Sequence, residues 1–259
     1  KYQSMYHKIS NKPSFFLISS DTGTKGVMMS IEKAMEDIRN GKIVLVYDFD
    51  DREKETDMTI ASEFITHETL RTFRKDAGGL VCTTTPFDVA KRVGLPFMSD
   101  VYWDDEKYPV LRMMSPNDIP YDNTKSSFGV TINHRNTYTG ITDNDRALTI
   151  KEYVKTIFQD KSPEGIREDL GKNFRAPGHV HLLNTSEVPL VNRKGHTELT
   201  NALMVMAGVK PSATICEMMG DDGNSEKKEN TMRYAKEHDL TFVTGDEIIK
   251  AWNEFKNRE

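Results

Sequence analysis

The 259-residue sequence contains only two cysteines, Cys82 and Cys216, which lie far apart. They form neither a disulfide framework nor a zinc motif, and we expect a reducing, cytoplasmic location. No apolar stretch reaches the roughly 20 residues that cross a bilayer, so we expect no membrane span. Basic residues are not in excess, because 35 Lys and Arg against 40 Asp and Glu give a net charge of −5. This balance offers nucleic acid no electrostatic footprint.

The first 27 residues have no amphipathic helical pattern. Their one apolar run, residues 15–18, is too short for a signal-peptide core, and no small-residue cleavage site follows it. We interpret residues 1–27 as an N-terminal extension without an assigned role. Residues 28–259 are expected to form one domain.

Short β-branched runs alternate irregularly with helical patterns along the rest of the chain. Residues 99–124 show no regular pattern, and residues 160–174 form a charged connector. The alternation predicts an α+β fold, a three-layer α/β/α sandwich around a mixed twisted sheet. The expected strands are 43–47, 58–64, 80–85, 126–132, 178–183, 214–219 and 240–243, and the expected helices are 30–41, 66–78, 86–94, 149–159, 196–207, 225–238 and 246–255.

An acidic segment, residues 48–57, joins two of the apolar runs. It holds six carboxylates in ten residues, together with Arg52, and it contains neither glycine nor proline. A solvated hairpin turn is one interpretation. However, a turn usually favours glycine or proline, and confined carboxylates repel one another until a hard cation binds. Oxygen ligands suit Mg²⁺, so the segment is a candidate metal site.

A second candidate site begins the helix expected at 196–207. Gly195 allows close backbone approach to a ligand, and a helix start offers free N–H groups to an anion. Arg193 and Thr197 add donors suited to a phosphate, and His196 offers a nitrogen to a metal. The alternative is a simple helix cap followed by an acid, Glu198. Together with the acidic segment, a shared metal and phosphate site is the better interpretation.

Residues 51–58, Asp-Arg-Glu-Lys-Glu-Thr-Asp-Met, resemble the signature of the 3,4-dihydroxy-2-butanone 4-phosphate synthase family, in its archaeal-type, monofunctional form. The resemblance runs from about residue 29 to the end. The chain lacks the clustered cysteines of the zinc-dependent domain that some relatives carry downstream. Lys194 departs from the small or polar residue of many relatives. Further matching segments are 79–82, 139–142 with 145–146, 177–180, 193–198, and 216–217 with 221–223.

The resemblance implies the conversion of ribulose 5-phosphate to formate and 3,4-dihydroxy-2-butanone 4-phosphate. It also implies Mg²⁺ or Mn²⁺, two ions per site, no organic cofactor, and a homodimer with shared active sites. Another metal-dependent sugar-phosphate lyase or isomerase, or a non-catalytic sugar-phosphate-binding regulator, would use similar groups.

The resemblance also implies the roles of individual residues. Glu53 and His196 are expected to bind the metal, while His179 and Thr139 reach the site of the partner subunit. Clustered acids suit repeated proton transfers, because like charges raise some of their pKa values. The expected catalytic residues are Glu55, Asp57, Glu217 and His179. The expected substrate-binding residues are Arg52, Glu53, Asp57, Thr139, Arg193, Lys194, Gly195, His196, Thr197 and Glu217.

Overall fold

A computed structural model describes residues 22–116 and 118–258, so most of the predicted N-terminal extension lies outside the described residues. Seven strands form one mixed sheet in the order β4-β5-β3-β6-β2-β1-β7, in which β1 pairs with β7 and β3 with β5 in parallel. The strands are β1 (Val44–Tyr47), β2 (Thr56–Ala61), β3 (Cys82–Thr85), β4 (Phe128–His134), β5 (Phe174–Asn184), β6 (Ala213–Glu217) and β7 (Thr241–Thr244).

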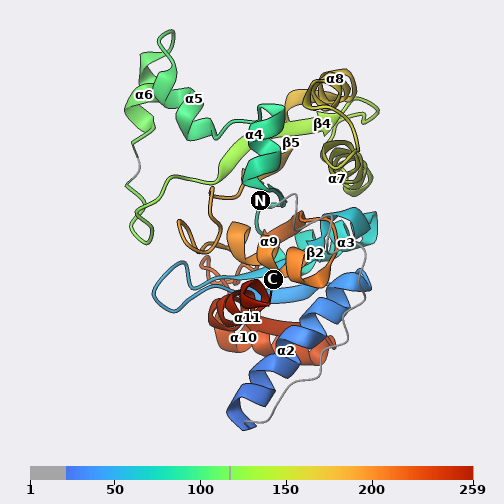
Figure 1. The fold of residues 1–259 in the computed structure, drawn as a ribbon, viewed down its shortest axis with the longest axis vertical. Helices are drawn as coiled ribbons and strands as arrows, with labels where there is room; N and C mark the ends of the chain where they lie inside the picture. Colours follow the sequence, from blue (N-terminus) through green and yellow to red (C-terminus); the bar gives the residue numbers. More distant parts are fainter. Residues whose placement is uncertain (1–21, 117, 259) are drawn as a thin grey trace.

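Helices cover both faces of the sheet, which confirms the predicted three-layer sandwich (Figure 1). One core joins the sheet to α2 (Thr22–Arg39), α9 (His196–Ala207) and α11 (Gly245–Asn257). The other joins the opposite face to α3 (His67–Thr72), α4 (Phe87–Val93), α7 (Asp143–Ile157) and α10 (Lys228–Glu237). Successive side chains of β1 point to opposite faces of the sheet, so Val44 and Val46 belong to the first core and Leu45 to the second.

Helix α9 is buried along its whole length, including its polar residues. A helix that is buried on all sides belongs to the centre of a domain. It ends at Gly208, whose φ of 72° lies in the left-handed region that favours glycine. Because His196 is the first residue of α9, the candidate phosphate site is attached to the most enclosed helix of the first core.

Several predicted elements have different bounds in the structure. Strand β2 covers Thr56–Ala61 rather than 58–64, because residues Ser62–Phe64 turn into a 3₁₀ helix. Helix α7 begins at Asp143 because the Thr142 hydroxyl caps it. The predicted connector at 160–174 contains α8 (Pro163–Asn173), which Ser162 caps. Helix α2 begins at Thr22 rather than 30, the helix predicted from 66 continues as a π-helix over Phe73–Ala77, and β5 extends to Phe174–Asn184.

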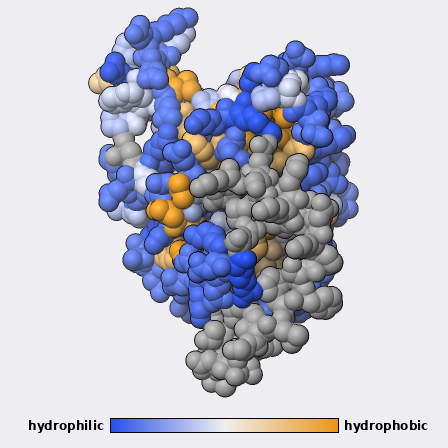
Figure 2. Space-filling model, in the orientation of Figure 1, coloured by the Kyte–Doolittle hydropathy of each residue, from blue (hydrophilic) through white to orange (hydrophobic). Residues whose placement is uncertain are grey.

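The segment predicted to be irregular contains two short helices, α5 (Met98–Asp104) and α6 (Pro109–Met114). Neither has a fully buried residue, so no amphipathic pattern marks them in the sequence. Figure 2 shows them in one of two upper arms, with hydrophobic side chains gathered along the hollow between the arms. Within residues 22–116 and 118–258, no helix is long and apolar enough to cross a membrane.

Candidate active site

The acidic segment is a hairpin loop between β1 and β2, organised around the buried carboxylate of Asp48. Asp48 Oδ2 accepts a hydrogen bond from the amide of Glu53 at 2.9 Å, and Oδ1 accepts one from the amide of Glu55 at 3.1 Å. Arg52 Nη1 lies 3.3 Å from Oδ2. Sequence reasoning did not single out Asp48. Its position directly after a buried strand, where aspartate commonly bonds the backbone ahead of it, was the available signal.

Replacing Asp48 by alanine is expected to lower the free energy of unfolding by about 2–4 kcal/mol, because the amides of Glu53 and Glu55 and the Arg52 guanidinium lose a buried charged acceptor. Asp48 is 1% exposed, so water does not replace the lost bonds. Urea unfolding of the variant and of the wild-type protein measures the difference. Asp51→Asn, an exposed acid in the same loop, is the control. A loss of less than 1 kcal/mol for Asp48→Ala would contradict the role of Asp48.

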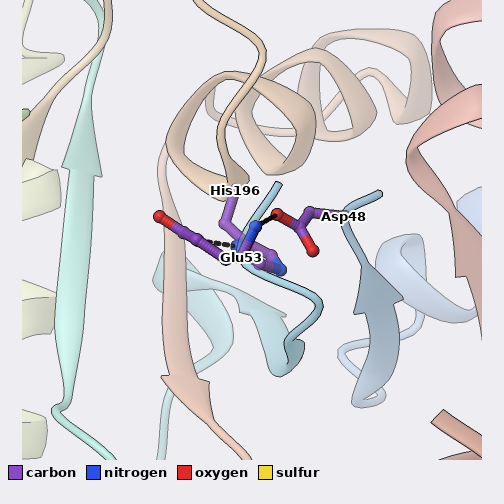
Figure 3. Close-up of side chains that lie close together, drawn as sticks. All are labelled: Asp48, Glu53 and His196. Atoms are coloured by element: carbon purple, nitrogen blue, oxygen red, sulfur yellow. Dashed lines mark hydrogen bonds and ion pairs between the residues drawn. The ribbon is translucent and has the colours of Figure 1, made fainter. Parts of the chain in front are cut away.

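The acidic loop and the start of α9 meet at His196 (Figure 3). His196 Nδ1 lies 3.0 Å from Glu53 Oε2, and Nε2 lies 3.2 Å from the backbone oxygen of Glu55. Asp57 Oδ1 is 3.7 Å from Nε2. The two segments that the sequence suggested as separate halves of a site therefore share one cluster.

The cluster favours positive charge at its centre. Burial lowers the pKa of His196, but Asp57 and Glu53 outweigh this effect and raise it to about 10. Burial raises the pKa of Glu53, but His196 and Arg52 reverse the effect and lower it to about 2. A buried imidazolium surrounded by carboxylates marks a position where a cation is stabilised.

Asp57 and Glu217 extend the cluster across the sheet. They are paired residues of the antiparallel strands β2 and β6, so their side chains lie on one face. Val46 is the other partner of Asp57 and belongs to the core that contains α9, which places both acids on the α9 side of the sheet. Burial, followed by the charge of Glu217 among its acidic neighbours, raises the pKa of Asp57 well above its usual value.

A backbone turn fixes the Glu217 side chain. Its Oε2 accepts a hydrogen bond from the amide of Leu80 at 2.7 Å. An added Cβ at Gly79 would lie 2.5 Å from Oε2 and 2.6 Å from the backbone oxygen of Glu217, so only glycine fits. Burial also raises the pKa of Glu55, although Ser225 donates to Glu55 Oε1 at 2.6 Å. Cys82, buried on β3, has its pKa raised by burial and then by Glu217.

The two predicted arginines lie at the rim of this cluster. Arg193 Nη1 donates to the fully buried Glu198 at 2.8 Å, and its guanidinium occupies the space that a Cβ at Gly195 would fill. Arg52 Nη2 donates to Asp122 at 2.9 Å. Sequence reasoning missed Asp122 as a site residue and treated Glu198 only as part of a helix cap. Thr197 is buried in the first turn of α9, and Lys194 is exposed.

His179 and Thr139 both contact Asn133. They lie apart from the His196 cluster in sequence and in the sheet. Both are exposed. Asn133 Nδ2 lies 3.1 Å from His179 Nδ1 and 3.5 Å from the backbone oxygen of Thr139. β3 separates β5, which carries His179, from β6, which carries Glu217. In a single chain these two predicted site residues therefore lie on a different part of the sheet from the His196 cluster.

The donor set fits a hard divalent ion. One ligand atom from each of Asp48, Glu53 and His196 lies within 4.8 Å of the others. Both oxygens of Asp48 accept amide hydrogen bonds that orient the loop, so Glu53 and His196 are the stronger candidates for protein ligands. The buried Asp57 Oδ1 has no hydrogen-bond partner among the described residues. Two candidate protein ligands beside the Asp57 oxygen that lacks a hydrogen bond suit Mg²⁺, which usually keeps several waters.

These features define an α+β protein in which a candidate acidic metal site adjoins the start of a buried helix. Comparison with known proteins identifies the family. The family model of 3,4-dihydroxy-2-butanone 4-phosphate synthase matches residues 32–251, and the chain belongs to this family.

Individual relatives match this chain over most of its length. The 3,4-dihydroxy-2-butanone 4-phosphate synthase of Methanothermobacter thermautotrophicus is 47% identical over 89% of this chain and 99% of its own. The solved Candida albicans synthase is 27% identical over 85% of this chain and 96% of its own, with a TM-score of 0.65. A further solved synthase, in complex with two magnesium ions, covers 87% of this chain and 97% of its own at 24% identity, with a TM-score of 0.67.

Proposed function

We propose that the protein converts D-ribulose 5-phosphate to formate and L-3,4-dihydroxy-2-butanone 4-phosphate, a step of riboflavin biosynthesis. Family membership supports this reaction. The observation that carries it is the meeting of Glu53 with His196 at 3.0 Å beside the buried Asp57, whose Oδ1 has no hydrogen-bond partner among the described residues. This arrangement provides metal ligands and proton-transfer groups in one place.

The residues divide the work by position. Glu53 and His196 would hold the metal, which would be magnesium or manganese with two ions per site. When bound, the metal would stabilise negative charge on adjacent substrate oxygens. Arg193, Thr197 and the N–H groups around Lys194 and Gly195 would bind the phosphate. Arg52 lies at the same rim and would contact the substrate as well.

The acids would exchange protons with the substrate. Burial raises the pKa values of Asp57 and Glu55, which favours the protonated form of each acid relative to an exposed carboxyl group. Glu217, fixed by the amide of Leu80, would face the reacting carbons. A reaction with several proton transfers needs more than one such group.

His179 and Thr139 would act across the interface of a homodimer. The loop that carries Thr139 presents Tyr138 at 97% exposure and Ile141 at 50%. Contiguous exposed apolar patches rimmed by polar residues mark interaction surfaces, and these two side chains would belong to such a surface in the proposed dimer. In this arrangement each subunit supplies His179 as a catalytic residue to its partner. We also infer that residues 28–259 form the catalytic domain and that the protein works in the cytoplasm, where the buried thiols Cys82 and Cys216 stay reduced.

The proposed reaction is tested by measuring formate from ribulose 5-phosphate, with Mg²⁺ and with EDTA. Metal-dependent formate release supports it. Turnover of ribulose 5-phosphate to other products would indicate a different lyase or isomerase. Substrate binding without any turnover would indicate a non-catalytic regulator.

Binding of Mg²⁺ is expected to release a proton. With a pKa of about 10, His196 carries its proton at pH 7, whereas a metal ligand must be neutral. Metal affinity is therefore expected to increase as the pH rises from 6 to 9. Calorimetric titration in two buffers of different ionisation enthalpy measures the released proton, and His196→Asn should remove the buffer dependence. Equal heats in both buffers for the wild-type protein would contradict this expectation.

A further inference from the structure

The guanidinium groups of Arg52 and Arg193 both point at one carboxylate oxygen of Asp122. Arg52 Nη2 donates to Asp122 Oδ2 at 2.9 Å, and Arg193 Nε lies 3.4 Å from the same atom. Asp122 belongs to the segment that precedes β4. Its Oδ1 accepts hydrogen bonds from the Thr124 amide at 2.8 Å and the Thr124 hydroxyl at 2.6 Å. The segment therefore aims the carboxylate at the arginine pair.

Acidic groups already neutralise the two guanidinium groups. Arg52 contacts Asp48 and Glu53 at 3.3 and 3.0 Å, in addition to Asp122. Arg193 contacts Glu198 at 2.8 Å. A phosphate dianion that approaches these arginines meets the like charge of Asp122, and juxtaposed like charges oppose binding.

One arginine donor remains open. Arg193 Nε is buried and has no hydrogen-bond partner among the described residues. Buried donors nearly always have an acceptor, so an unpaired one calls for an explanation. Asp122 lies near it without forming a hydrogen bond. An anionic oxygen of a ligand at this place would accept a hydrogen bond from Arg193 Nε.

We propose that Asp122 is a built-in competitor for the substrate phosphate. It neutralises Arg52 and Arg193 in the ligand-free protein and yields part of these contacts when a phosphate dianion binds. The assignment of the arginines to phosphate rests on the proposed function. A ligand must then bind the arginines more strongly than one carboxylate does, which selects phosphorylated sugars over sugar acids and free sugars.

The test measures binding of inorganic phosphate to the full chain by calorimetry, with and without Mg²⁺, for wild type and Asp122→Asn. Removal of one like charge is expected to tighten phosphate binding by about tenfold. Asp122→Ser removes the carboxylate in a second way and should act in the same direction. Asp118→Asn, an exposed acid ahead of Asp122, is the matched control and should leave phosphate binding unchanged.

The KM for ribulose 5-phosphate provides an independent measurement. It is expected to fall in Asp122→Asn, while kcat changes less. Phosphate binding that is unchanged or weaker in both Asp122 variants would overturn the proposal and make Asp122 a residue that merely holds the arginines. Failure of the proposed reaction is distinguishable, because wild type would then release no formate whatever the phosphate affinities are.

Discussion

Glu53→Gln is expected to reduce formate release from ribulose 5-phosphate by on the order of 10³-fold or more, because it removes the negative charge with which Glu53 would hold the metal. Gln keeps the shape of the side chain. The loop should keep its structure as well, since the bonds that organise it go to Asp48 rather than to the Glu53 carboxylate. The loss should therefore lie in catalysis and not in folding.

Initial rates over a range of Mg²⁺ concentrations measure this effect, and thermal unfolding checks the fold. Asp51→Asn changes the same charge at an exposed position of the same loop and should retain nearly wild-type turnover. Saturating Mg²⁺ should not restore Glu53→Gln. Wild-type-like turnover in this variant would remove Glu53 from the list of metal ligands.

Asp57→Asn is expected to lower kcat by about 10²–10⁴-fold while making the fold more stable. Burial outweighs the nearby His196 charge and, with Glu217, Glu53 and Glu55, raises the pKa of Asp57, whose Oδ1 has no hydrogen-bond partner among the described residues. An ionised carboxylate in this environment is unfavourable, and the amide removes the charge. We expect an increase of about 1–2 kcal/mol in the free energy of unfolding at pH 7.

The pH dependence of this increase has a definite sign. The pKa of Asp57 is raised in the folded protein, so its ionisation penalises folding at pH values above its unfolded pKa of about 4. The stability gap between variant and wild type should thus be small near pH 4 and widen towards neutrality. Urea unfolding from pH 4 to 8 measures it. A gap that narrows as the pH rises would show that Asp57 is instead stabilised in its ionised form.

Hydrophobic runs predicted the sheet well, because buried strands such as β1 consist of apolar residues on both faces. Polar residues inside a strand made its first residue difficult to predict. Thr56 and Asp57 look like loop residues, yet both are fully buried in β2, where the Thr56 hydroxyl meets that of Thr231 at 2.9 Å. The short helices α5 and α6 escaped prediction because no core face shapes their sequence.

The site was predictable to the extent that its residues are close in sequence. The acidic loop and the start of α9 each carry a local pattern, and their meeting could be inferred from shared chemistry. The separation of Asp122 from Arg52 is 70 positions, and no local pattern links an acid in an irregular segment to an arginine in a distant loop. Likewise, nothing in the sequence shows that Asp48 turns inward while Glu53 stays partly accessible.

The pairing of β2 with β6 makes the alignment of two strands a condition for the proposed active site. Asp57 lies directly opposite Glu217 only in the observed register. A shift of β2 by one position would rotate Asp57 to the opposite side of the sheet and bring Met58 into its place. Insertion or deletion of one residue in the β1–β2 hairpin is therefore the kind of sequence change most apt to yield a folded chain without turnover.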